Sequence, residues 1–155
     1  MPQKNNNIHA ITRTADKISR NIFSPIEIQD VFTGKRIKTK GLWDTGATGS
    51  VITKSTASAL GLISFGKRKV RGVHGTKEVN VYFVNITLSN KNITLNTQVT
   101  ECDELSADKS IGMLIGMNII TMGDFAITNF QNKTTMSFRI PSLQKIDFLK
   151  ISAIN

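Results

Sequence analysis

The sequence predicts a single all-β domain that carries one or two short helices. Its 155 residues are close to the usual size of one domain. Apolar and polar side chains alternate with a period of two in several short segments, and turn residues separate these segments. Helical signals are confined to residues 53–60 and 117–122. With 39% hydrophobic and 20% charged residues, the composition is that of neither a disordered polymer nor a membrane bundle.

The first predicted pair of strands leads directly to an aspartate. Residues 1–21 are polar and rich in asparagine, and we expect them to form a flexible N-terminal arm. Residues 26–32 alternate apolar and polar side chains, a Thr-Gly-Lys turn follows, and residues 36–43 resume the extended pattern. The second strand of this hairpin therefore ends immediately before Asp44.

A short helix and a long hairpin are expected next. Residues 53–60 are rich in Ser, Thr, Ala and Leu, and Gly61 is the kind of residue that ends many helices. Residues 70–83 predict a long hairpin because of their high β-branched content. Gly72 and Gly75 bracket its tip, where glycine permits positive φ and mobility.

The middle of the chain predicts another antiparallel pair and a buried strand. Residues 82–88 and 93–99 look like two strands joined by a polar turn. Residues 111–116 form a short apolar run closed by glycine, which is typical of a buried strand. Residues 117–122 follow it with apolar side chains at helical spacing.

A final predicted hairpin closes the domain. Residues 124–130 and 135–140 alternate around a turn, and Pro141 ends the second strand. We therefore place one folded domain over residues 22–141. The tail, residues 142–155, is amphipathic, and its pattern leaves open whether it forms a strand or a helix and whether it packs on this domain or on a second copy.

The chain is basic, with 20 Lys and Arg against 11 Asp and Glu and a net charge of +9. Such a charge makes a basic nucleic-acid-binding domain one hypothesis for the function. Two basic clusters, residues 35–40 and 67–71, partly alternate with apolar or small residues, as the solvent face of a strand does. Because no aromatic RNA-binding motif, helix-turn-helix spacing or zinc finger accompanies them, we expect solvated strands and no specific nucleic-acid partner.

Cysteine and histidine are too scarce for a structural metal site. The single Cys102 excludes an intrachain disulfide, and His9 and His74 are the only histidines. Cys102 also lies between two acidic residues, which should raise the pKa of its thiol and disfavour a reactive thiolate. We expect neither a metal nor another cofactor.

No hydrophobic segment approaches the roughly 18 residues that a membrane-spanning helix needs. The polar first residues also lack the apolar stretch of a secretory signal peptide. We therefore expect no membrane partner and a cytoplasmic location.

The most informative segment is 42–52, which reads Leu-Trp-Asp-Thr-Gly-Ala-Thr-Gly-Ser-Val-Ile. Its aspartate, Asp44, lies between large apolar and small residues, and burying a lone carboxylate is costly unless something pairs with it. If a second carboxylate lay within hydrogen-bonding distance, the two could not both ionise and would share one proton. Such a pair can activate water against a peptide carbonyl without a covalent adduct, with an activity profile on the acidic side of neutral.

This segment resembles the active-site loop of aspartic proteases, in which Asp-Thr-Gly-Ala is followed by a small residue and an apolar pair. Because the short chain has one such motif, it is similar to the retropepsin-like (retroviral-type) members, of the cellular or bacterial kind, that work as homodimers. Leu-Ile-Gly at 114–116, followed by a helix, is similar to the element behind the active-site loop in this family. The resemblance covers residues 26–140 and implies a closed β-barrel of the pepsin and retropepsin type, a single lobe that dimerises, and hydrolysis of polypeptide substrates.

The resemblance implies a role for each matching residue. Asp44 matches the catalytic aspartate, Thr45 the residue whose hydroxyl reaches the partner's loop, and Gly46 the residue whose backbone approaches the substrate. Substrate contacts are expected from the rest of the loop, the tip of the hairpin, called the flap in this family, and the buried strand: Ala47, Thr48, Gly72, Val73, His74, Gly75 and Ile115. Structural support is expected where the family often has a hydroxyl and an amide that tie the helix to the loop: Ser50, Gly116 and Asn118.

Two positions depart from the viral members of the family. Those members commonly place an acidic residue at the position of Thr48 and a basic one at Met117, which together form an ionic network between subunits. Both are missing here. We therefore expect the dimer contacts to come from elsewhere, with the N-terminal arm and the C-terminal tail as candidates.

Simpler interpretations accompany these motifs. Asp-Thr-Gly alone is a common turn sequence. A second hypothesis for the function is a retropepsin-fold module that binds peptides or dimerises without proteolysis. Asp124 begins a strand and lacks the Thr-Gly loop, so we interpret it as a turn residue rather than a second catalytic carboxylate. His74 is expected to be an exposed tip residue, because aspartic chemistry does not call for a histidine base.

Overall fold

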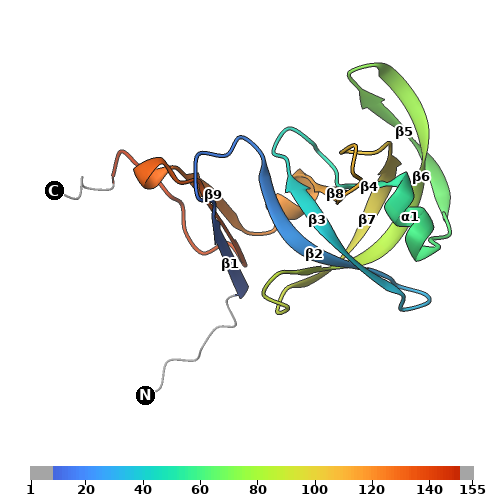
Figure 1. Cartoon of the computed structure of the whole chain (residues 1–155), viewed down its shortest axis with the longest axis horizontal. Coiled ribbons are helices and arrows are strands. Elements are labelled where there is room, and N and C mark those ends of the chain that lie inside the picture. The colour runs from blue at the N-terminus through green and yellow to red at the C-terminus, as the bar shows by residue number, and fades with distance from the viewer. Residues whose placement is uncertain (1–8, 151–155) are drawn as a thin grey trace.

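A computed structural model describes residues 9–150, and this part of the chain is dominated by β-strands, as predicted (Figure 1). The strands are β1 (His9–Thr14), β2 (Ile22–Asp30), β3 (Arg36–Trp43), β4 (Val51–Thr53), β5 (Gly66–Gly72), β6 (Gly75–Leu88), β7 (Thr94–Cys102), β8 (Ile111–Ile115), β9 (Asp124–Thr128) and β10 (Thr135–Ile140). The helices are α1 (Lys54–Leu60), α2 (Met117–Ile120) and the 3-10 turn η1 (Phe130–Asn132).

Six of the strands close into a barrel. The order is β2-β3-β8-β4-β7-β6, and β2 pairs with β6 as well as with β3, which joins the two ends of the sheet. The interior is apolar, and Ile28, Val84, Ile86 and Met113 are completely buried in it. The predicted hairpin of β2 and β3 is present, and its second strand ends at Trp43, one residue before Asp44.

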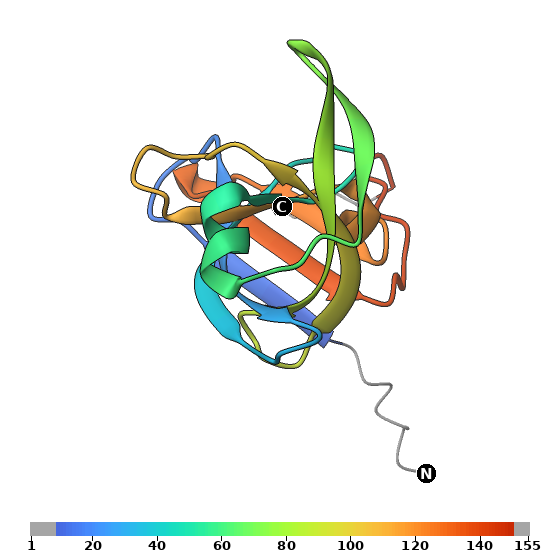
Figure 2. The same ribbon diagram turned by 90° about the vertical axis from the view of Figure 1, so that its right-hand side faces the viewer.

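The predicted long hairpin extends beyond the barrel wall (Figures 1 and 2). β6 has 14 residues, and its first half pairs with β5. Its second half belongs to the barrel, where it pairs with β2 and, from Val81 onward, with β7. Gly72 and Gly75 face one another at the tip, and Gly75 has the positive φ of 109° that favours glycine. We call the projecting part, residues 66–80, the flap.

The two predicted helices are present in shorter form. Thr53 caps the N-terminus of α1 by accepting a hydrogen bond from the Thr56 backbone N–H, and Gly61 ends the helix in the left-handed conformation. α2 ends at Ile120, two residues earlier than predicted, where Thr121 turns its hydroxyl back onto the Met117 carbonyl.

The expectation of a flexible arm over residues 1–21 is wrong for residues 9–14, which form β1. β1 pairs antiparallel with β10, from His9 opposite Ile140 to Thr14 opposite Thr135. Only Ile11 of this strand is buried, at 5% exposure, so the segment shows almost no apolar alternation in the sequence. Its partner strand lies about 125 residues away along the chain, and no local pattern indicates such a pairing.

β1, β10 and β9 form a second, three-stranded sheet that packs against the barrel. Trp43, at the end of β3, joins the two layers, because its ring stacks on Phe125 at 5.4 Å and contacts Phe138 at 5.0 Å. The indole Nε1–H of Trp43 donates to the buried Ser24 hydroxyl at 2.9 Å. The residue before Asp44 is thereby held by both sheets.

The C-terminal tail is anchored by Asp124. Its carboxylate accepts hydrogen bonds from Arg139 Nε at 2.7 Å, from the Ser142 hydroxyl, and from the Leu143 backbone N–H at 2.9 Å. These donors hold the pKa of Asp124 well below its usual range, with the Leu143 N–H as the largest cause. Residues 142–150 form neither a strand nor a helix, and residues 151–155 of the predicted tail lie outside the described part of the chain.

Candidate active site

Asp44 begins the loop that connects β3 to β4. Its backbone N–H donates to the Ile115 carbonyl at 3.0 Å, which fastens the start of the loop to the end of β8. Its carboxylate Oδ1 accepts a hydrogen bond from the Gly46 N–H at 2.8 Å. Asp44 is half-buried, whereas Thr45 and Gly46 are exposed. The carboxylate is therefore oriented by its own turn, while the next two residues face solvent.

β8 and α2 hold the rest of this loop. β8 lies between β3, to which it is parallel, and β4, to which it is antiparallel. The chain then turns beneath the loop, where the Met117 N–H donates to the Ala47 carbonyl at 2.8 Å and the Asn118 N–H donates to the Thr48 carbonyl at 3.1 Å. Three backbone hydrogen bonds, including the one from Asp44, thus fix the loop to a single neighbouring segment.

The Ser50 side chain adds two hydrogen bonds to these backbone contacts between the loop and the β8–α2 segment. Its hydroxyl is buried, accepts a hydrogen bond from the Gly116 N–H at 3.0 Å, and donates to Asn118 Oδ1 at 2.8 Å. This is the hydroxyl–amide contact that the family resemblance implies. Asn118 also donates through Nδ2 to Thr97 on β7 at 3.3 Å, a link that the sequence does not indicate because β7 lies far from it along the chain.

Gly116 is required by close packing rather than by its backbone conformation. Its φ of −95° is open to any residue. A Cβ at this position would lie 2.5 Å from the Gly49 carbonyl oxygen and 2.9 Å from that of Ala47, distances that backbone atoms cannot tolerate. The glycine that ends β8 therefore lets the active-site loop lie directly against the strand.

The predicted substrate-contact residues divide into exposed and buried ones. Val73 is 99% exposed at the tip of the flap, and His74 beside it is exposed as expected. Figures 1 and 2 show the flap and the loop between β3 and β4 at the same end of the barrel. Thr48 is exposed and Ala47 half-buried, but Ile115 is completely buried in the core. The expected substrate contact of Ile115 is not supported, because its side chain packs inside the barrel beside Gly41.

Two other groups with catalytic potential, the Cys102 thiol and the Asp124 carboxylate, do not belong to this site. Burial, followed by the nearby charges of Asp103, Glu104 and Glu101, raises the pKa of the Cys102 thiol to about 12, which removes it as a nucleophile near neutral pH. Asp124, interpreted from the sequence as a turn residue, is the first residue of β9, and its carboxylate holds the C-terminal tail.

Within residues 9–150 there is no cluster of three or more His, Cys, Asp or Glu side chains placed to hold a metal ion. The same residues include no helix with the length and apolar character needed to cross a membrane.

Residues 27–119, more than half of the chain, match the sequence profile of a family described as aspartyl protease. The chain belongs to the aspartyl protease family. The matched range extends from β2 to α2 and contains the Asp44 loop, the flap and the Gly116 contact. A comparison of this sequence with curated proteins finds no match.

Solved structures agree with this assignment at the level of the fold. A retropepsin-like aspartic protease from Rickettsia conorii is 15% identical with a TM-score of 0.52, and the alignment covers 85% of this chain and 94% of that one. The retroviral protease-like domain of Ddi1 from Leishmania major is 18% identical with a TM-score of 0.51, covering 82% and 97%. The fold of this aspartyl protease family member is therefore retropepsin-like, as the sequence predicts.

Proposed function

We propose that the chain is an aspartic endopeptidase that works as a homodimer. The observation that carries this proposal is the Asp44 loop, a single Asp-Thr-Gly-Ala turn held by the backbone hydrogen bonds from β8 and α2 and by Ser50. One chain supplies one such carboxylate, and the chemistry needs two. A second copy of the chain would supply the other, and Thr45 is exposed beside Asp44, where a partner's loop could meet its hydroxyl.

In the proposed reaction the two Asp44 carboxyl groups share one proton. The ionised carboxylate takes a proton from a water molecule, whose oxygen forms a bond to the peptide carbonyl carbon, while the neutral carboxyl protonates the carbonyl oxygen. The tetrahedral intermediate then collapses, the C–N bond breaks, and a proton passes to the leaving amine. No covalent bond forms between the protein and the substrate.

The flap supplies the other side of the proposed peptide site. Gly72, Val73, His74 and Gly75 form an exposed tip that can close over an extended polypeptide, and Ala47 and Thr48 lie on the opposite, loop side. Closure of a hairpin over the substrate would exclude water from the reaction. We place the activity in the cytoplasm, on the sequence argument alone.

Replacement of Asp44 by asparagine tests the proposal. Asp44→Asn keeps the shape of the side chain and its contact with the Gly46 N–H, but it removes the proton acceptor, so we expect cleavage of unfolded polypeptides to fall by more than about 100-fold. The matched control is Asp16→Asn, which changes an exposed carboxylate outside the loop.

Wild-type and variant proteins are compared by peptide-cleavage kinetics, by thermal unfolding, and by binding of pepstatin, a mimic of the tetrahedral intermediate. A folded Asp44→Asn variant that cleaves at the wild-type rate would refute the proposal. A wild-type protein that neither cleaves nor binds pepstatin would also refute it and would favour the hypothesis of a peptide-binding module.

A further inference from the structure

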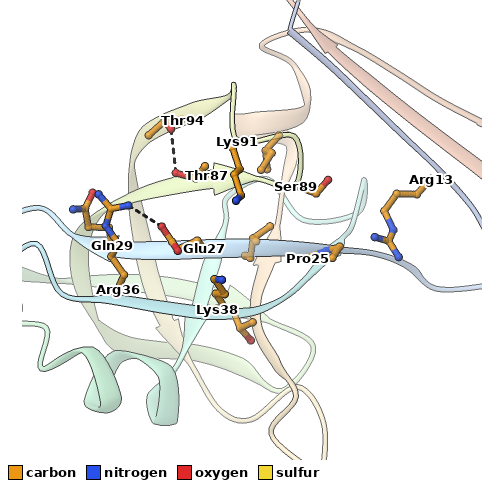
Figure 3. A pocket seen from close by; sticks show the side chains of 13 residues that line it. Arg13, Pro25, Glu27, Gln29, Arg36, Lys38, Thr87, Ser89, Lys91 and Thr94 are labelled. Atoms are coloured by element: carbon orange, nitrogen blue, oxygen red, sulfur yellow. Dashed lines mark hydrogen bonds and ion pairs between the residues drawn. The ribbon is translucent and has the colours of Figure 1, made fainter.

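A cavity lies away from the active-site loop (Figure 3). It has a volume of about 730 Å³ and is an open groove between β2, β3, the turn that joins β6 to β7, and Arg13 of β1. Asn90 in that turn donates to the Ala10 carbonyl at 2.9 Å, which ties the turn to β1. No residue of the Asp44 loop or the flap lines this groove.

Positive charge converges on this groove from segments that are far apart in the sequence. Arg13, Arg36, Lys38 and Lys91 line it, and Glu27 is the one acidic lining residue. Glu27 forms an ion pair with Arg36 at 3.0 Å. Within residues 9–150, the other three cations have no acidic partner within ion-pair distance. Figure 3 shows Lys91 on one side of β2 and Lys38 on the other.

The gathered charges require an explanation, because like charges repel when they are brought together by folding. An anion that occupies the groove would relieve the repulsion. Thr87, Ser89 and Thr94 add hydroxyl groups to the lining, and those of Thr87 and Thr94 form a hydrogen bond with each other at 3.0 Å.

The dimensions of the groove favour an anion with several charges over a single small ion. Arg36 and Lys38 are two positions apart on one face of β3, a spacing of roughly 6.6 Å along the strand. Arg13 and Lys91 extend the cationic lining onto two further segments. No aromatic side chain lines the groove, so base stacking is not available there and binding has to rely on phosphate contacts.

We propose that this groove binds a chain of phosphate groups, as in a single-stranded nucleic acid or an inorganic polyphosphate. The site is distinct from the proposed peptidase site, because the residues that line the groove include none from the Asp44 loop or the flap. Figure 1 shows the flap at the top of the molecule and this turn at the bottom. The groove gives part of the excess positive charge of the chain a specific function.

Fluorescence anisotropy with a labelled oligo(dT) tests this proposal across a range of salt concentrations. Phosphate contacts from the three cations without an acidic partner predict roughly 20-fold weaker binding at 200 mM salt than at 50 mM. In the double variant Lys38→Ala/Lys91→Ala only the Arg13 contact remains, so we expect weaker binding at 50 mM salt and only about a threefold salt effect. The matched control is Lys133→Ala/Lys145→Ala, which removes two exposed cations outside the groove and should bind as the wild type does.

Competition distinguishes the possible ligands. Inorganic polyphosphate and unlabelled oligo(dT) should both displace the probe, and the tighter of the two identifies the source of the phosphates. Thermal unfolding of each variant checks that the fold is retained. Wild-type binding by the Lys38/Lys91 variant, equal loss in the control variant, or equal displacement by poly-glutamate would each overturn the proposal.

Discussion

Ser50 shows how one small side chain organises the candidate active site. Its hydroxyl satisfies the Gly116 N–H and Asn118 Oδ1 in a position where water has almost no access, since Ser50 is 2% exposed. Gly116 can approach so closely only because it has no side chain. These two residues place the Asp44 loop against β8, and neither of them has to touch the substrate.

Ser50→Ala should therefore destabilise the fold more than an ordinary hydroxyl deletion does. The change leaves the buried Gly116 N–H without an acceptor, at an expected cost of about 1–3 kcal/mol in the free energy of unfolding. Ser55→Ala is the matched control, because its hydroxyl bonds to Glu104 at the exposed surface and should cost less than about 0.5 kcal/mol. Urea unfolding measures both, and equal free energies for the two variants would contradict the role assigned to Ser50.

Strand β1 shows where local sequence patterns stop being informative. The hairpins β2–β3, β5–β6, β6–β7 and β9–β10 join neighbouring segments, and their alternation and turn residues predict them. β1 joins a partner near the other end of the chain through backbone hydrogen bonds, with exposed hydroxyl pairs such as Thr12 with Ser137 on its outer face. Such polar residues resemble those of a flexible arm when they are considered without the partner strand.

Ile11 should carry most of the side-chain contribution of β1. It is buried against the core, so Ile11→Ala is expected to lower the free energy of unfolding by about 2–5 kcal/mol through lost burial and a new cavity. Thr12→Ala, its neighbour on the exposed face, should change this free energy by less than about 0.5 kcal/mol. Chemical denaturation tests the pair; an Ile11→Ala variant as stable as Thr12→Ala would mean that β1 is not docked in solution.

At the scale of the whole molecule, each chain contributes a single Asp-Thr-Gly loop. The viral positions for an ionic network between subunits hold Thr48 and Met117 instead, so a dimer of this chain has to form through other contacts. The proposed activity is thus a property of an assembly, and its dependence on concentration follows from mass action.

We expect the peptidase activity per chain to fall on dilution, in step with the fraction of dimer. Cleavage rates and sedimentation velocity, measured over the same series of protein concentrations, give the two quantities to compare. An inactive Asp44→Asn chain added in excess should also lower the wild-type activity by forming mixed dimers. Constant activity per chain in samples that sediment only as monomer would refute the homodimeric mechanism.

The sequence by itself determined the all-β class, the order of the hairpins, the capped helix α1 and the residues of the Asp44 loop. Each of these depends on interactions between residues that are close along the chain, so that periodicity, turn residues and motif spacing report them directly. Only the tertiary structure decided that β1 pairs with β10 and that Ile115 is buried in the barrel rather than exposed beside the loop. It also decided that Arg13, Lys38 and Lys91 meet in one groove. These outcomes depend on contacts between distant segments, and such contacts exist only once the barrel has closed.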